Sequence, residues 1–371
     1  MSPRLREYLD EKMQRFNLRG AAGYVSQPRD DQDKIYAPSA PLRRTRPMEV
    51  DLRIIGCIQS APYDQGWLHS CTANAIASAI QFGRNAAQTT KVAGHLDPAR
   101  LFIYWYQRIT DSETQFTAME LEKYLYKVAE LGSKGKDGQF DASDTVEGID
   151  KHGTHRSVPM SEVYRRLQED HGGNIRDGIR CLRRLGVCRE QTWPYSLPLE
   201  QDKQAFLTST AYIMPPVGAL REGRRAFNQD FLYRRILDLG DDINTDLVGH
   251  MESALMEGYP IIMAMWFPKD VTKTFNHTNL TSDSTYMHLA DSSGEYCGHT
   301  VLVVGYERYP FGIEGRFLCL QSGGRWCDNN DGYFYLPYYR FQKITGKFED
   351  YLFGGLRAQV TDLWVISMDQ I

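Results

Sequence analysis

Hydrophobic positions in the first half of the chain repeat with the period of an α-helix. The segment CTANAIASAIQF, which starts at Cys71, carries apolar residues at i, i+3, i+4 and i+7, where they share one helix face. The members of this stripe are Ala73, Ile76, Ala77 and Ile80. Three further segments read as helices, and these are residues 99–109, 116–131 and 175–185. The pattern predicts a first half that is mainly helical.

The second half has a different pattern, in which short β-rich runs are separated by clusters of Gly, Asp and Asn. The predicted strands are residues 260–267, 300–306, 316–321, 332–336 and 362–367. Helices followed by strands are typical of an α+β architecture with two segregated lobes. A cleft between two such lobes is the natural place for a ligand.

Composition divides the chain into an extension and two lobes. Residues 1–48 are rich in Pro, Asp and Arg, which favours an extended or irregular path. We predict a mainly helical lobe at 49–225 and a mainly β lobe at 226–371. Within the helical lobe, residues 132–160 are rich in glycine and charge and show no period, so we expect an inserted surface loop there.

The charge and hydropathy of the chain give no reason to expect a nucleic-acid partner, an anionic membrane partner or a membrane span. The 371 residues are 42% hydrophobic with a formal net charge of -4 and a pI near 6.2, which gives no electrostatic reason to expect nucleic acid or an anionic membrane as partner. No apolar run reaches the roughly 18 residues of a membrane span.

The cysteine pattern does not predict a metal site. None of the seven cysteines forms C-x-x-C, and no histidine lies at zinc-finger spacing, so no structural metal is expected. An odd count leaves at least one thiol outside intramolecular pairing, and we take this thiol to be Cys71. The pairing of the other six stays open.

Cys71 stands where a predicted helix begins, with Ser70 as a plausible N-cap. The dipole of the helix would favour the thiolate form of Cys71, which is the nucleophilic form. The amide of Gln65, together with the backbone N–H of Cys71, could stabilise an oxyanion. On the residues alone, a cysteine that is simply packed at the start of an Ala-rich helix is the more frequent case.

The stretch YDQGWLHSCTANAIA resembles the active-site segment of papain-like cysteine peptidases, and it is most similar to the branch found in bacteria and large viruses. This resemblance implies that Gln65 is the oxyanion-hole glutamine and that Cys71, six residues later, is the nucleophile. CGHTVLVVGYE resembles the strand that carries the catalytic histidine, which implies this role for His299. Three more segments agree in order, at 50–53, 171–195 and 332–341.

The resemblance implies an α+β, two-lobed fold, with a helical lobe facing an antiparallel, β-barrel-like lobe across the cleft that holds the active site. It implies hydrolysis of peptide bonds in a polypeptide substrate through an acyl-enzyme, with no cofactor. Gly172 and Gly173 would present bare backbone to an extended peptide. Thr300, beside His299, would contribute to the wall of the pocket for the substrate side chain.

Two positions depart from the family pattern. The family expects Asn-Ser-Trp-Gly, where Asn orients the catalytic imidazole and Trp shields that bond. This chain has LQSGGRW, so Gln321 takes the Asn position and Gly323 the Trp position, and the spacing to Gly332 is one residue longer. His69 stands where the family has Gly, and would line or crowd the pocket for the residue before the scissile bond. A solvent-facing side chain on a turn is the alternative for His69.

These departures leave other functions open. A papain-like fold could serve as a binding or structural module with little peptidase activity. An acyl-transfer enzyme of transglutaminase type shares the Cys–His–acid logic, although the Gln–Gly pair before the cysteine does not favour it. Finally, GYVSQPRDDQDKIY resembles the N-terminal stretch of the bacterial relatives, and papain-like enzymes commonly carry an N-terminal segment that blocks the cleft. The resemblance implies this role for residues 1–48, with residues 43–46 (RRTR) as a plausible cleavage region, and their removal is expected to raise activity.

Overall fold

A computed structural model describes much of the chain, in segments. The described residues are 23–25, 33–38, 46–54, 62–66, 68–87, 97–110, 145–149, 155–159, 161, 165, 167, 170–196, 214–226, 232–236, 247–268, 296–309, 315–323, 332–338, 341 and 360–367. All structural statements below concern these residues.

The larger sheet has seven antiparallel strands in the order β4-β9-β5-β6-β7-β8, and β1 pairs with β6 beside this path. The strands are β1 (Glu49–Asp51), β4 (Leu232–Ile236), β5 (Ile261–Pro268), β6 (Tyr296–Arg308), β7 (Gly315–Leu320), β8 (Tyr333–Pro337) and β9 (Val360–Ser367). At 13 residues β6 is the longest of the described strands, and it pairs with three others. It therefore lies at the centre of the predicted β lobe.

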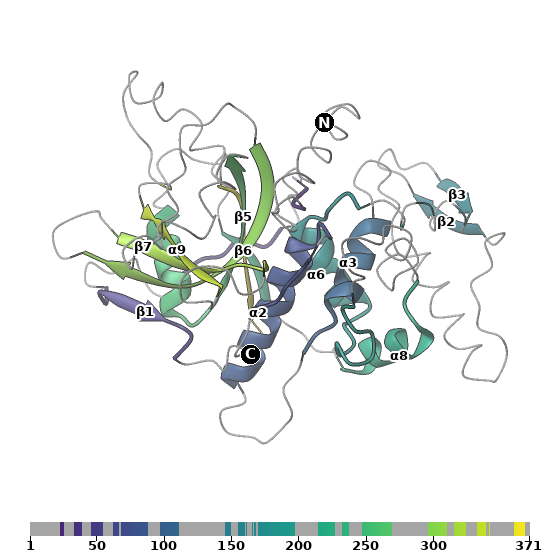
Figure 1. Ribbon diagram of the computed structural model, residues 1–371, viewed down its shortest axis with the longest axis horizontal. Coiled ribbons are helices and arrows are strands. Elements are labelled where there is room, and N and C mark those ends of the chain that lie inside the picture. The colour runs from purple at the N-terminus through teal and green to yellow at the C-terminus, as the bar shows by residue number, and fades with distance from the viewer. Residues whose placement is uncertain are drawn as a thin grey trace.

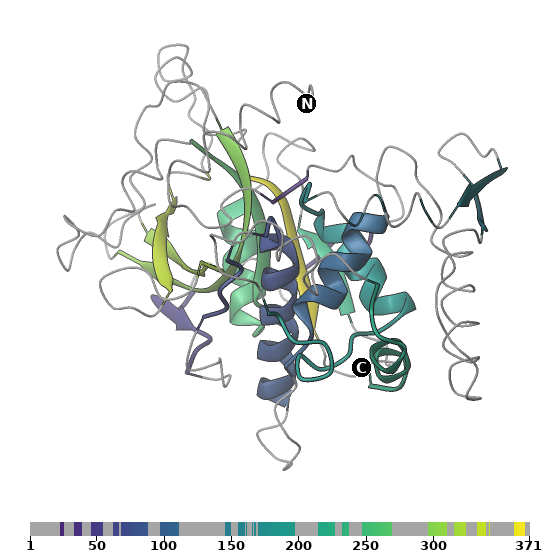
Figure 2. The same cartoon turned by 45° about the vertical axis from the view of Figure 1, so that its right-hand side comes forward.

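In the described part of the chain, five helices accompany this sheet. They are α2 (Cys71–Ala87), α3 (Arg100–Ile109), α6 (Ile175–Arg184), α8 (Val217–Ala226) and α9 (Leu247–Met256). Helix α2 contacts β5, β6 and β9 as well as α3 and α6, so it lies between the sheet and the other helices of its lobe (Figures 1 and 2). Helix α9 packs on β5 and β6 instead.

The predicted stripe on α2 explains this central position. Its four apolar residues are completely buried, which removes that face of the helix from water. Burial of each larger aliphatic side chain stabilises the fold by about 1.5–3 kcal/mol. The helical side of the core adds the aromatic residues Phe102, Trp105 and Trp193, and the sheet side adds Phe317 and Trp364. Both lobes thus share one hydrophobic core around α2.

The structure confirms the helix predicted to start at Cys71, the helices predicted at 99–109 and 175–185, and all five predicted strands. The helix predicted at 116–131 lies outside the described residues. Within the segment 132–160, the structure has a separate two-stranded antiparallel sheet of β2 (Thr145–Ile149) and β3 (His155–Pro159). Strands β1 and β4 and helices α8 and α9 were not predicted, because each is short or lacks a clear period.

None of the helices in the described part of the chain is long and apolar enough to cross a lipid bilayer.

Candidate active site

Cys71 is the first residue of α2. The backbone N–H of Asn74 donates to the Ser70 carbonyl at 3.0 Å, so the first helical turn begins at Ser70, as predicted. The Cys71 side chain is completely buried, and this desolvation raises the pKa of the thiol to about 11. Hydrogen bonds with Thr300 and Thr72 act in the opposite direction, because they favour the thiolate.

His299 lies on β6, directly before Thr300. The hydroxyl groups of Thr72 and Thr300 are 3.0 Å apart, so the residue after Cys71 is hydrogen-bonded to the residue after His299. His299 is 7% exposed, and burial lowers the pKa of its imidazole to about 4. A hydrogen bond with the side chain of Gln321 partly offsets this effect.

Gln321 follows the end of β7, and its backbone N–H donates to Gly332 at 3.1 Å. Its side chain lies against Gly323. A Cβ atom added at Gly323 would be 2.5 Å from Nε2 of Gln321, closer than real Cβ contacts allow. The longer amide of Gln321 therefore uses space that any side chain at residue 323 would need.

Gln65 is buried beside this segment. Its backbone N–H donates to the Ser322 carbonyl at 2.8 Å, and its Nε2 donates to the Leu68 carbonyl at 2.9 Å. The Ser322 hydroxyl donates to Oε1 of Gln65. Ser322 thus holds the amide in one orientation. The sequence contained a signal for this residue, because Ser322 matches the serine of the family motif.

Gly172 and Gly173 lie beside the described N-terminal residues. The Gly173 N–H donates to the Gly23 carbonyl at 2.7 Å, and the Val25 N–H donates to the Gly173 carbonyl at 3.0 Å. The Gly23 N–H donates to the Gly298 carbonyl, next to His299, at 3.0 Å. A Cβ atom added at Gly23 would be 3.0 Å from Sγ of Cys71. Residues 23–25 therefore pass directly over the predicted nucleophile.

His69 packs against Asp170. Its backbone N–H donates to the two carboxylate oxygens of Asp170 at 3.0 and 3.1 Å, and Nδ1 is 2.8 Å from the Asp170 carbonyl oxygen. Both side chains are 18% exposed. The Tyr104 hydroxyl also donates to Asp170 and accepts from the Gly172 N–H at 3.3 Å. His69 is thus half-buried and joins the turn before Cys71 to the segment that carries Gly172.

Two remaining predictions concern thiols and metals. Among the described residues, Cys71, Cys181, Cys188 and Cys319 are free thiols, and all four are buried. In the same part of the chain, no group of three His, Cys, Asp or Glu side chains could hold a metal ion.

Comparison with known proteins supports the family resemblance. No family model matches the chain. An Acanthamoeba polyphaga mimivirus protein described as an uncharacterized peptidase C1-like protein is 26% identical over 291 residues, which cover 78% of this chain and 68% of the viral protein. The crystal structure of xylellain, a cysteine protease from Xylella fastidiosa, superposes with a TM-score of 0.60 at 23% identity and covers 95% of this chain and 97% of xylellain.

The sequence motifs predict a helix that begins at Cys71, followed later in the chain by a strand that carries His299. The structure has both elements in this order, and the strand belongs to the antiparallel sheet. The likeness to xylellain extends over nearly the whole of both chains. The chain therefore has the fold of the papain-like cysteine peptidases, which confirms the resemblance carried by its sequence.

Proposed function

We propose that this chain is a cysteine peptidase that hydrolyses peptide bonds through an acyl-enzyme. The observation that carries the proposal is the 3.0 Å hydrogen bond between the hydroxyls of Thr72 and Thr300, which joins the start of α2, where Cys71 lies, to the part of β6 that carries His299. Nucleophile, imidazole and orienting amide thus come from three elements, α2, β6 and the end of β7. A papain-like protein without catalytic activity has no chemical need for this combination of residues.

The proposed reaction has two steps. The Cys71 thiolate attacks the substrate carbonyl carbon, and His299 donates its proton to the leaving amine. His299 then takes a proton from water, which hydrolyses the thioester and releases Cys71. The Gln65 amide and the Cys71 backbone N–H would donate to the oxyanion in both steps. No step requires a cofactor.

The substrate class follows from backbone groups beside the nucleophile. Gly173 offers both an N–H and a carbonyl, and Gly298 offers a carbonyl, as their bonds to residues 23–25 demonstrate. Such groups bind an extended polypeptide irrespective of its side chains. His69 and Thr300 are proposed to limit the side chain beside the scissile bond, since one packs before Cys71 and the other against its thiol.

Residues 23–25, which we term the blocking segment, are proposed to inhibit the enzyme. Tyr24 pairs with Gly173 in a parallel bridge. The Gly23 carbonyl accepts from the Gly173 N–H and therefore does not point toward the Gln65 amide. The segment thus occupies the substrate position with its nearest carbonyl turned away from the oxyanion donors, so it blocks the site without being cleaved.

Residues 33–38, which we term the anchoring segment, differ from the blocking segment because they are built into the fold. Asp33 forms ion pairs with Arg176 on α6 and with Arg235 on β4, and Arg235 also bonds Asp362 on β9 at 3.0 Å. All these charged side chains are largely buried. Asp33 thus connects the helical lobe to the sheet.

The described end of the extension, residues 46–48, is also fixed to the sheet lobe. Arg46, at the end of the predicted cleavage region, pairs with buried Glu252, and its side chain is only 9% exposed. Residues 43–45 lie outside the described residues. Removal of all of residues 1–48 would therefore eliminate Asp33 and Arg46 together with the blocking segment.

We predict that removal of residues 1–30 raises the rate of peptide hydrolysis at least about tenfold, which corresponds to about 1.4 kcal/mol of intramolecular binding by the blocking segment. Removal of residues 1–48 should lower the free energy of unfolding by about 3–5 kcal/mol, because it leaves the two buried arginines without their shared carboxylate. A coumarin peptide amide reports hydrolysis, and urea denaturation reports stability. Equal hydrolysis by the full chain and the form lacking residues 1–30 would contradict the inhibition.

Active-site labelling tests the nucleophile. We predict that an epoxysuccinyl peptide labels the protein lacking residues 1–30 at one site and that Cys71→Ala abolishes the label, as measured by intact mass. Buried Cys181 and Cys319 should stay unlabelled and serve as internal controls. Absence of labelling in a folded protein would favour the binding-module function, whereas incorporation of an amine into a glutamine donor would reveal a transglutaminase.

The pH dependence of thiol alkylation should change when the blocking segment is removed. Burial raises the pKa of Cys71 to about 11, and the thiolate is the reactive form, so iodoacetamide should react slowly with the full chain near pH 7 and faster as the pH rises toward 11. Without residues 1–30 the thiol is less desolvated, which shifts the alkylation profile to lower pH. Peptide mapping identifies Cys71 as the alkylated residue. Identical alkylation profiles for both forms would show that the blocking segment does not control the pKa of the Cys71 thiol.

Gly323→Ala should lower kcat about tenfold, because the new Cβ would displace Gln321 and disturb its bond to His299. The double variant Gln321→Asn, Gly323→Ala should recover part of this loss, since asparagine is shorter by one methylene group. The measurement is steady-state hydrolysis, with thermal unfolding as the control for stability. A fully active Gly323→Ala variant would show that Gln321 does not depend on this space.

A further inference from the structure

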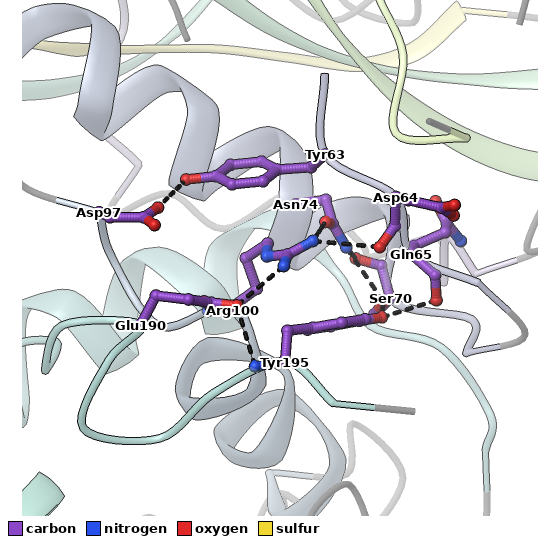
Figure 3. A network of polar contacts seen from close by, with 9 residues as sticks. All are labelled: Tyr63, Asp64, Gln65, Ser70, Asn74, Asp97, Arg100, Glu190 and Tyr195. Atoms are coloured by element: carbon purple, nitrogen blue, oxygen red, sulfur yellow. Dashed lines mark hydrogen bonds and ion pairs between the residues drawn. The ribbon is translucent and has the colours of Figure 1, made fainter. Parts of the chain in front are cut away.

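We propose that Tyr195 is a positioning residue whose hydroxyl fixes the oxyanion donor Gln65 relative to the nucleophile Cys71. The inference rests on the proposed peptidase function. Figure 3 shows the network that surrounds this tyrosine. Tyr195 follows α6 in the chain and belongs to a different segment from either catalytic group.

One hydroxyl group connects the two catalytic segments. The Tyr195 hydroxyl donates to the backbone carbonyl of Gln65 at 2.8 Å and is 2.6 Å from the Ser70 hydroxyl (Figure 3). Since its single proton is directed to Gln65, the Ser70 hydroxyl is the donor in the second bond. Ser70 Oγ in turn accepts from the Asn74 side chain at 3.1 Å. The chain of bonds thus runs from the first turn of α2 to Gln65.

A buried ion pair holds Tyr195 in place. The Glu190 carboxylate accepts from the Tyr195 N–H at 3.0 Å, from the Arg100 N–H at 3.1 Å and from the Arg100 guanidinium at 2.8 Å. The guanidinium lies 4.0 Å from the centroid of the Tyr195 ring and 4.3 Å from that of Tyr63. This stacking fixes the plane of the Tyr195 ring.

Arg100 makes a second bridge between the same two segments. Its guanidinium donates to the Asp64 carbonyl at 3.2 Å and to Oδ1 of Asn74 at 3.0 Å (Figure 3). Asp64 precedes Gln65, and Asn74 lies in the first turn of α2. The Tyr195 hydroxyl and the Arg100 guanidinium therefore connect the oxyanion segment to the nucleophile helix at two points.

This geometry matters because an oxyanion donor acts only at hydrogen-bond distance from the developing charge. Complete removal of such a donor lowers kcat by about 10²–10³. Loss of the Tyr195 hydroxyl would only loosen the segment, so we expect a smaller effect. The effect should appear in steps that form an oxyanion and be absent from simple alkylation of the thiol.

The test is the substitution Tyr195→Phe. It is made in the full-length protein or in the form lacking residues 1–30, whichever hydrolyses the peptide amide before Tyr195 is changed. We expect kcat to fall about tenfold with KM unchanged, and the affinity for a peptide aldehyde, whose adduct carries an oxyanion, to fall by a similar factor. The rate and pH profile of Cys71 alkylation by iodoacetamide should not change.

The matched control is Tyr63→Phe. The Tyr63 hydroxyl donates to Asp97 at 2.6 Å, and its ring stacks on the same guanidinium, but this hydroxyl does not bridge the two catalytic segments. We expect this variant to retain wild-type kcat and aldehyde affinity. Unfolding measurements on both variants separate local from global effects.

Two results would overturn the proposal. One is wild-type kcat and aldehyde affinity in Tyr195→Phe, and the other is a parallel loss of hydrolysis and alkylation in that variant. A wild-type protein that neither hydrolyses the amide nor binds the aldehyde would overturn the proposed function itself, and the positioning role with it. Active wild type with an unaffected variant would overturn the positioning role alone.

Discussion

The site depends on the packing of α2 against β6. This contact brings the start of a helix to the middle of a strand, and the bond between Thr72 and Thr300 fixes the two elements at the level of Cys71 and His299. The register of β6 is equally important, because a shift of one residue would turn every side chain of the strand to the other face. Pairing with β5 and β7 prevents this shift. The sheet therefore holds the strand that carries His299 in a fixed register against α2.

Burial controls the chemistry of this pair. With residues 23–25 in place, desolvation raises the pKa of Cys71 and lowers that of His299, so both groups are uncharged near neutral pH. A charged thiolate–imidazolium pair needs either solvent or a polarised substrate beside it. On the proposed function, the blocking segment would therefore oppose catalysis in two ways, by occupying the substrate position and by favouring the neutral forms of Cys71 and His299. Asp33 keeps the segment nearby without being part of it.

Local sequence patterns sufficed for the central elements and failed for contacts made at long range. The stripe on α2 and the apolar runs of the strands are periodic, so they are visible in the sequence. The sequence also indicated Cys71, His299 and Gln65 through their motifs. It could not indicate Tyr195, Arg100 or Asp33, because their roles arise from partners far away in the chain. Short elements such as β1 and β4 were missed because pairing, rather than propensity, forms them.

Each departure from the family pattern is matched by a second residue that accommodates it. Gln321 is longer than the expected asparagine, and Gly323 provides the space that this length requires. His69 replaces a glycine, and Asp170 holds its backbone and ring against the neighbouring segment. In the first pair Gly323 leaves room for the longer side chain, and in the second Asp170 provides hydrogen bonds to His69. A sequence that had lost selection for catalysis would have no reason to keep both pairs at the same site, so the two pairs support the proposed function.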